Sequence, residues 1–235
     1  MSGAPRVICF DLDDTLVSEA DYVESGLRAV GTLLDRELPG PEPGARWLVE
    51  RWRQTRARDL FQQLLARRGA EEARWLPRLV AAYRAHLPTL APRPGAVEAL
   101  GAILARGDRL ALVSDGWLDV QRRKWEALAL PFPFAPVVFT DERGRGFWKP
   151  HPWGFEQVMA AHPDAAGFVY VGDNPAKDFE APAALGWATV LLAHEQNLYS
   201  PSSDAVALPS ARNFAELVAL TAAPLIPAAA RCIRT

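Results

Sequence analysis

The stretch VICFDLDDTL, residues 7–16, decides the fold of this chain. Four apolar residues run directly into three aspartates within four positions, Asp11, Asp13 and Asp14. A short apolar run that contains β-branched side chains and ends in acids is typical of a strand buried on both faces, as in a parallel sheet. The stretch therefore predicts a first strand at residues 6–10 with carboxylates at its carboxyl end.

Predicted helices and strands alternate after residue 95. This alternation is typical of an α/β fold with a parallel, Rossmann-like sheet, in which ligands bind at the carboxyl ends of the strands. The predicted strands are residues 109–114, 136–139, 167–172 and 188–192. The predicted helices are residues 96–106, 118–128 and 176–185, with a further helix after His151.

A different pattern fills the region between the first strand and this alternating part. Apolar residues recur at helical spacing from residue 18 to residue 86, with glycine and proline clusters between the runs. The sequence therefore predicts an α/β core at residues 1–16 and 91–221, an all-helical insert that forms a domain of its own at 17–90 and a C-terminal tail at 222–235.

Composition restricts the kind of partner. The 235 residues carry a formal net charge of -2 without a basic block, which argues against nucleic acid and anionic membranes. The apolar stretch at residues 222–230 is far shorter than the roughly 20 residues that span a bilayer, and the two cysteines form no disulfide or metal-binding framework. We expect a cytoplasmic monomer or homodimer that acts on a small molecule.

Polar residues follow three of the predicted strands. They are Asp11 to Thr15 after the first strand, Ser114-Asp115-Gly116 after the second, and residues 172–178 after a later one. Any one group alone is explained by turns and helix caps. Parallel topology brings all three together, however, and crowded carboxylates need a cation to remain ionised. Aspartate oxygens are ligands that Mg²⁺ accepts, so the pattern favours a magnesium site.

Four motifs carry a family resemblance. FDLDDTL, LVSDG, WKP and GDNPAKDF, in that order and with a helical insert after the first, resemble the motifs of the haloacid dehalogenase superfamily. Most members are Mg²⁺-dependent phosphatases, and one branch carries a helical cap at the position of the insert. The resemblance implies a Mg²⁺-dependent phosphomonoesterase acting on a small phosphorylated metabolite, such as a sugar phosphate or nucleotide monophosphate.

The resemblance also assigns roles in the reaction. Asp11 is expected to attack phosphorus and form a transient aspartyl phosphate. Asp13 is expected to protonate the leaving alkoxide and later to take a proton from the attacking water. Thr15 is expected to orient Asp13 by a hydrogen bond, or alternatively to cap the turn.

Further roles concern the metal and the phosphate. Asp11, the backbone carbonyl of Asp13 and Asp173 are the implied Mg²⁺ ligands. Asp178 is expected nearby, either acting through water or orienting Lys149. The implied substrate-binding residues are Ser114 and Lys149, which contact the phosphate, Asp115 and Gly116, which shape their loop, and Arg56 in the insert.

Lysine is rare in this chain, which contains 23 arginines but only Lys124, Lys149 and Lys177. A compact ammonium differs from the planar guanidinium beside a phosphoryl group, so a retained lysine hints at a specific need. This supports Lys149 independently of the resemblance, whereas Lys177 could equally be an exposed helix residue.

The same residues limit the alternatives. Relatives that cleave phosphonates use a cap lysine, and residues 17–90 contain none. Dehalogenating relatives do not need the second acid, which is present here as Asp13. A phosphomutase remains open. A non-catalytic binding module also remains, although the intact Asp11, Asp13, Lys149 and Asp173 count against it.

An arginine-rich stretch at residues 46–69 lies in the insert. Arg53, Arg56 or Arg58 could contact a second anionic group on the substrate, because caps of this kind close over an active site. A solvated helix face is the alternative, and it is the commoner role of such charge runs.

Overall fold

The computed structural model describes residues 4–194 and 208–223, and the chain divides into two compact units. The core unit contains the chain up to Glu19 and from Ala91 onward, and the helical unit is Ala20–Leu90. The first boundary thus lies three residues beyond the one expected from the sequence. The predicted tail lies mostly outside the described residues.

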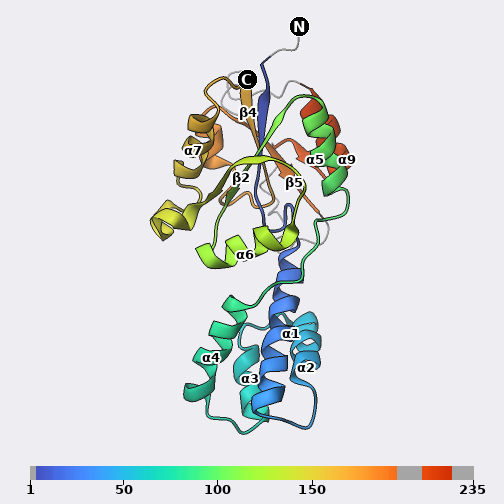
Figure 1. Ribbon diagram of the computed structural model, residues 1–235, viewed down its shortest axis with the longest axis vertical. Helices are drawn as coiled ribbons and strands as arrows, with labels where there is room; N and C mark the ends of the chain where they lie inside the picture. The colour runs from blue at the N-terminus through green and yellow to red at the C-terminus, as the bar shows by residue number, and fades with distance from the viewer. Residues whose placement is uncertain (1–3, 195–207, 224–235) are drawn as a thin grey trace. The chain divides into compact units, whose positions relative to one another are not determined.

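The core unit contains a six-stranded parallel sheet, which confirms the predicted Rossmann-like α/β fold (Figure 1). Because β1 lies between β2 and β4, the three strands that precede the motif loops are immediate neighbours. Cys9 of β1, for example, pairs with Ala111 on one side and Tyr170 on the other. In spatial order the strands are β3 (Phe134–Phe139), β2 (Arg109–Ser114), β1 (Arg6–Phe10), β4 (Gly167–Gly172), β5 (Ala188–Leu192) and β6 (Ser210–Ala211).

Helices cover both faces of this sheet. Side chains alternate between the faces of a strand, and Val7 and Cys9 pack on the face that carries α7 (Trp153–Ala161) and α8 (Glu180–Ala184). In Figure 1, α5 (Ala96–Ala105) and α9 (Phe214–Ala222) lie side by side on the opposite side of the sheet from α7. The strands are therefore buried on both faces, as the apolar run at the start of the chain predicts.

Two parts of the core unit differ from the sequence-based expectation. The helix predicted at 176–185 is only α8, because residues 174–178 form a turn in which the backbone N–H of Asp178 donates to the carbonyl of Asn174. The second difference is that β6 and α9 were not predicted from the sequence. Asn213 caps α9 by accepting a hydrogen bond from the backbone N–H of Glu216.

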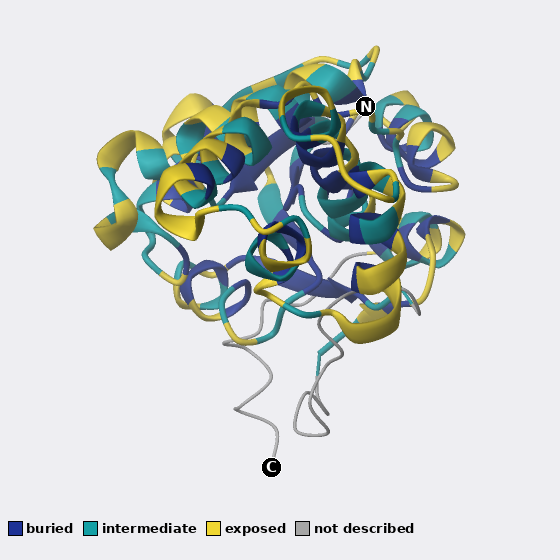
Figure 2. Ribbon diagram, turned by 90° about the horizontal axis from the view of Figure 1, so that it is seen from below, coloured by how far each residue is buried: buried dark blue, intermediate teal, exposed yellow. Residues whose placement is uncertain are grey.

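The helical unit is built on α1 to α4. Leucines and tryptophans of these helices, such as Leu34, Trp52 and Leu64, are buried. Figure 2 shows helices that are buried along one side and exposed along the other. The buried Arg68 forms a partly exposed ion pair with Asp35, which also accepts a 2.9 Å hydrogen bond from the backbone of Gly44. These contacts join three helices at one end. The helices are α1 (Glu19–Glu37), α2 (Gly44–Thr55), α3 (Leu60–Arg67) and α4 (Glu72–Ala85).

No helix in the described part of the chain has the length and apolar character needed to cross a membrane. The thiol of Cys9 lies fully buried in β1, where burial raises its pKa well above the usual value. A buried, protonated thiol is unreactive, so Cys9 serves as a core residue.

Candidate active site

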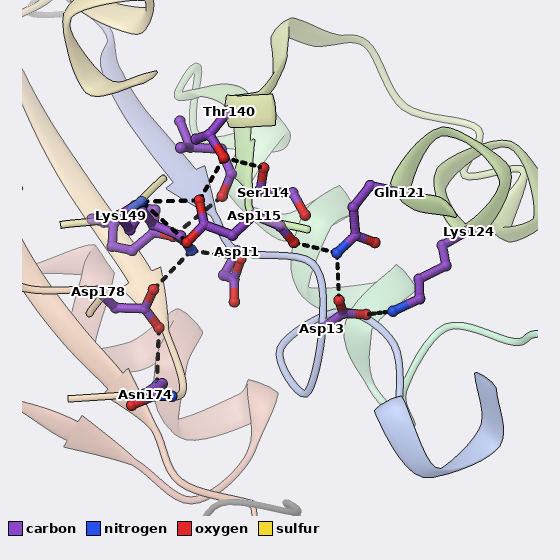
Figure 3. Close-up of polar contacts among 12 residues, drawn as sticks. Asp11, Asp13, Ser114, Asp115, Gln121, Lys124, Thr140, Lys149, Asn174 and Asp178 are labelled. Carbon is purple, nitrogen blue, oxygen red and sulfur yellow. Dashed lines mark hydrogen bonds and ion pairs between the residues drawn. The ribbon is translucent and has the colours of Figure 1, made fainter. Parts of the chain in front are cut away.

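The predicted site residues of the core unit meet at the carboxyl ends of the central strands, as Figure 3 shows for Asp11, Ser114 and Asp178. Asp11 follows β1, Asp115 follows β2, and Asp173 follows β4. The backbone N–H of Asp11 donates a 2.8 Å hydrogen bond to the carbonyl of Val171, which fixes the first loop against β4. The sheet topology thus brings together Asp11 and Asp173, which lie 162 positions apart in the sequence.

Lys149 organises the first of two charged clusters. Its ammonium donates to Asp11 Oδ1 at 2.8 Å, to Asp178 Oδ1 at 2.7 Å and to the hydroxyl of Tyr170 at 2.8 Å. All three of its protons are used, and the lysine and both carboxylates are buried. We call Lys149, Asp11, Asp178 and Tyr170 the Lys149 cluster.

Burial and like charges shift the pKa values of the carboxylates at this edge. Burial raises the pKa of Asp11 to about 6, although Lys149 opposes the rise. Burial and the neighbouring Asp11 and Asp178 raise the pKa of Asp173 to about 8. For Lys149, burial alone would lower the pKa, but Asp11 and Asp178 outweigh it and hold the pKa well above the usual value. An additional cation would relieve the repulsion among the carboxylates.

The carboxylates of Asp11, Asp173 and Asp178 fit a divalent metal ion. One oxygen from each lies within 4.8 Å of the others, and hard cations such as Mg²⁺ take oxygen ligands of this kind. Asp11 Oδ2 has no hydrogen-bond partner among the described residues. Asp178 uses Oδ1 for Lys149 and accepts a 2.9 Å hydrogen bond from the backbone of Asn174 on Oδ2, an arrangement that orients Lys149.

Two buried hydroxyls at this edge lack partners. Ser114 Oγ and Thr15 Oγ1 are both buried without a hydrogen bond to any described residue. The hydrogen bond expected from Thr15 to Asp13 is therefore not formed. Instead the backbone N–H of Thr15 closes a turn on the carbonyl of Leu12 at 3.3 Å. A buried hydroxyl without a partner is costly, so a ligand oxygen is the natural partner of Ser114.

Asp115 and Gly116 shape the second loop. The Asp115 carboxylate accepts a 2.6 Å hydrogen bond from the hydroxyl of Thr140 and 3.1 Å hydrogen bonds from the backbone N–H of Lys149. It thereby ties the second loop to the segment that carries Thr140 and Lys149. Gly116 adopts a φ of 131°, and a Cβ there would lie 2.5 Å from the amide nitrogen of Gln121.

Asp13 belongs to a second charged cluster, which the sequence analysis missed. Lys124 Nζ lies 2.7 Å from Asp13 Oδ1 and 2.6 Å from Glu19 Oε2. Gln121 donates a 2.7 Å hydrogen bond to Asp13 Oδ2 (Figure 3). We call Lys124, Asp13, Glu19 and Gln121 the Lys124 cluster. The rarity of lysine was a signal for Lys124, whereas no pattern in the sequence indicated Gln121.

Two other positively charged residues, Lys177 and Arg56, lie outside both clusters. Lys177 is half-buried rather than exposed, and Asp11 and Asp178 hold its pKa above the usual value against burial and Lys149. Arg56 lies in the helical unit, at the left-handed residue that ends α2, where its guanidinium stacks 3.8 Å from the ring centre of Trp52. This stacking gives Arg56 a local role within its own unit.

The family model of haloacid dehalogenase-like hydrolases matches residues 5–186, which contain both charged clusters. The chain belongs to this family of hydrolases. Two curated members align over most of the chain, and both are called glyceraldehyde 3-phosphate phosphatase. One, from Methanocaldococcus jannaschii, is 27% identical over 78% of this chain and 82% of its own. The other, from Pyrococcus abyssi, is 30% identical over 79% and 80%.

Solved structures support the haloacid dehalogenase fold. A hydrolase of the family from Bacillus subtilis, solved bound to magnesium, has a TM-score of 0.61 at 18% identity and covers 92% of this chain and 98% of its own. A hydrolase of the family from Xanthomonas campestris has a TM-score of 0.58 at 21% identity and covers 94% and 96%. At these identities the likeness concerns the fold alone.

Proposed function

We propose that this hydrolase is a Mg²⁺-dependent phosphomonoesterase that acts on a small phosphorylated metabolite through an aspartyl-phosphate intermediate. One observation carries the proposal: among the described residues, one carboxylate oxygen of Asp11 has no hydrogen-bond partner, and neither has the buried hydroxyl of Ser114 at the same sheet edge. A nucleophilic oxygen and a phosphate-binding donor are the two groups that phosphoryl transfer to an aspartate needs.

The reaction divides into two displacements. Asp11 Oδ2 attacks phosphorus while Asp13 gives a proton to the leaving alkoxide, and the ester bond breaks as the Asp11–phosphorus bond forms. Asp13 then takes a proton from the water that hydrolyses the intermediate, which frees Asp11 and releases phosphate. Lys149 holds Asp11 Oδ1 and so directs Oδ2 toward the phosphorus.

The metal ligands proposed from this donor set are Asp11, Asp173 and the backbone carbonyl of Asp13, with Asp178 beside them orienting Lys149. Bound Mg²⁺ would neutralise phosphoryl oxygens, which allows a carboxylate to approach the phosphate. Ser114 would donate its hydroxyl to the same phosphate.

The names of the relatives suggest where to look for the substrate. The two relatives that align over most of the chain are called glyceraldehyde 3-phosphate phosphatases, and a Thermus thermophilus protein called phosphoserine phosphatase is 35% identical over 40% of this chain and 37% of its own. Short monophosphates should therefore lead a panel that also contains sugar phosphates and nucleotide monophosphates. We further propose that the helical unit acts as a cap, with Arg56 among the residues that select the substrate. A cytoplasmic location and a monomeric or homodimeric state also remain predictions.

The deciding experiment measures phosphate release from p-nitrophenyl phosphate and from the panel, with Mg²⁺ or with EDTA, for the wild type and Asp11→Asn. We expect release that needs both the metal and Asp11. A folded protein that transfers phosphate between substrates but does not release it would instead be a phosphomutase. No turnover at all, with Mg²⁺ bound, would support a binding module.

A further inference from the structure

Asp13 is held by side chains on one face of α6 (Leu118–Leu128). Lys124 reaches Asp13 Oδ1 and Gln121, three positions earlier, reaches Asp13 Oδ2. Residues three apart on a helix lie side by side, so the two donors form a fork around one carboxylate. Both oxygens of Asp13 are thus held by hydrogen bonds, in contrast with Asp11, one oxygen of which has no partner in the described part of the chain.

Each donor of this fork is anchored by a second contact. Lys124 also binds Glu19 at the start of α1, and its side chain is only 3% exposed. Gln121 also donates to the backbone carbonyl of Asp115, the residue after β2. Gly116 makes room for Gln121, because a Cβ at Gly116 would collide with the amide group. The fork therefore ties Asp13 to the second loop and to Glu19, the last residue of the first core segment.

A buried lysine must be paired, and Lys124 has two carboxylate partners. A contact between Glu19 and α6 would need only Lys124. It would not need Gln121, whose buried amide group donates to the second oxygen of Asp13. The whole arrangement fixes the orientation of the Asp13 carboxylate rather than simply neutralising it.

We propose that Lys124 and Gln121 are positioning residues that hold the Asp13 carboxyl group in the orientation from which it donates a proton to the leaving alkoxide. The inference rests on the proposed function, since Asp13 is the general acid only if the chain cleaves phosphate esters. Lys124 acts through Asp13 and does not contact the reacting phosphorus.

The test compares two leaving groups in the full-length Lys124→Met protein. p-Nitrophenolate leaves without a proton, whereas an alkoxide needs the general acid, which typically contributes about 10²-fold to 10⁴-fold. We expect kcat/KM, which reports only the steps up to formation of the aspartyl phosphate, to fall at least about tenfold more for an alkyl phosphate of the panel than for p-nitrophenyl phosphate. The Asp13→Asn protein should show the same bias and sets its upper limit.

Controls keep the outcome decisive. Arg6→Met removes a partly buried ion pair with Asp108 near the opposite ends of the strands, so it should lower stability without any leaving-group bias. If Lys124→Met does not fold, Gln121→Leu tests the same fork with the Lys124–Glu19 pair retained. An equal fall in kcat/KM on both substrates, or no fall on the alkyl phosphate, would overturn the positioning role. Wild-type protein that releases no phosphate from either substrate would instead overturn the proposed function.

Discussion

The Lys149 and Lys124 clusters are built from the same kinds of charged groups but bind their aspartates differently. In each, a buried lysine bridges two carboxylates. The Lys149 cluster binds one oxygen of Asp11, and burial raises the pKa of that aspartate. The Lys124 cluster binds both oxygens of Asp13; although burial alone would raise the pKa of Asp13, Lys124 and Gln121 lower it. The two clusters therefore differ in how they bind the aspartate: the first contacts one carboxylate oxygen of Asp11, and the second contacts both carboxylate oxygens of Asp13.

The largest expected effect separates the two lysines. Lys149→Met should lower kcat on p-nitrophenyl phosphate and on an alkyl phosphate alike, by roughly 10²-fold to 10³-fold, since both reactions need Asp11. It should also lower the free energy of unfolding by about 3–5 kcal/mol, because two buried carboxylates lose their cation. Steady-state kinetics and urea unfolding check both. A leaving-group bias in Lys149→Met like that expected of Lys124→Met would erase the distinction between the clusters.

Metal binding should distinguish the same two regions. Mg²⁺ at about 100 times its dissociation constant should stabilise the wild type by about 2.7 kcal/mol in thermal unfolding. Asp173→Asn should lose most of this gain because it removes a ligand oxygen. Asp13→Asn is the matched control, since only the backbone carbonyl of Asp13 is proposed to bind the metal. Equal losses in the two variants would contradict that assignment.

Two glycines offer a paired test. A Cβ at Gly172 would lie 2.6 Å from Asp178 Oδ2 in the Lys149 cluster, and one at Gly116 would lie 2.5 Å from Gln121 Nε2 in the Lys124 cluster. Each Gly→Ala change should cost about 1–3 kcal/mol of stability. Gly172→Ala should slow both substrates, whereas Gly116→Ala should slow the alkyl phosphate more. The same kinetic pattern in both variants would show that the clusters are coupled.

His194 provides a smaller contrast, because it is a half-buried base that is not bridged between two acids. Burial and Arg93 lower its pKa to about 4, against 6.5 in an unfolded chain. The unfolded state therefore binds more protons between these values, and the stabilisation present above pH 6.5 is lost as pH falls toward 4. His194→Gln should remove about 1 kcal/mol of this dependence, allowing for solvent screening. Urea unfolding of both proteins at pH 7 and pH 5 measures it, and parallel pH curves would argue against it.

Sequence patterns predicted the core far better than the contacts within it. β1, β2, β4 and β5 begin and end where their apolar runs do, because buried parallel strands must be apolar throughout. β6 is only two residues long, too short to produce a pattern, and it was missed together with α9.

The same contrast holds at the site. The motifs place Asp11, Ser114 and Asp173 at one edge because each lies at the end of, or directly after, one of three neighbouring strands. Gln121 and Tyr170 lie inside a helix and a strand whose patterns do not depend on them. The unmade hydrogen bond between Thr15 and Asp13 depends on the exact turn at residues 12–15, which a sequence motif does not specify.

The position of β1 in the middle of the sheet has a consequence for chain synthesis. Asp11 is synthesised well before Lys149, which follows 138 positions later, and Asp178 comes later still. A growing chain that has completed β1, β2 and β3 carries Asp11 without the lysine that binds it and without the neighbouring strand β4. Contacts this distant in sequence form slowly. The Lys149 cluster can therefore form only after β4 and the turn that contains Asp178 have been synthesised.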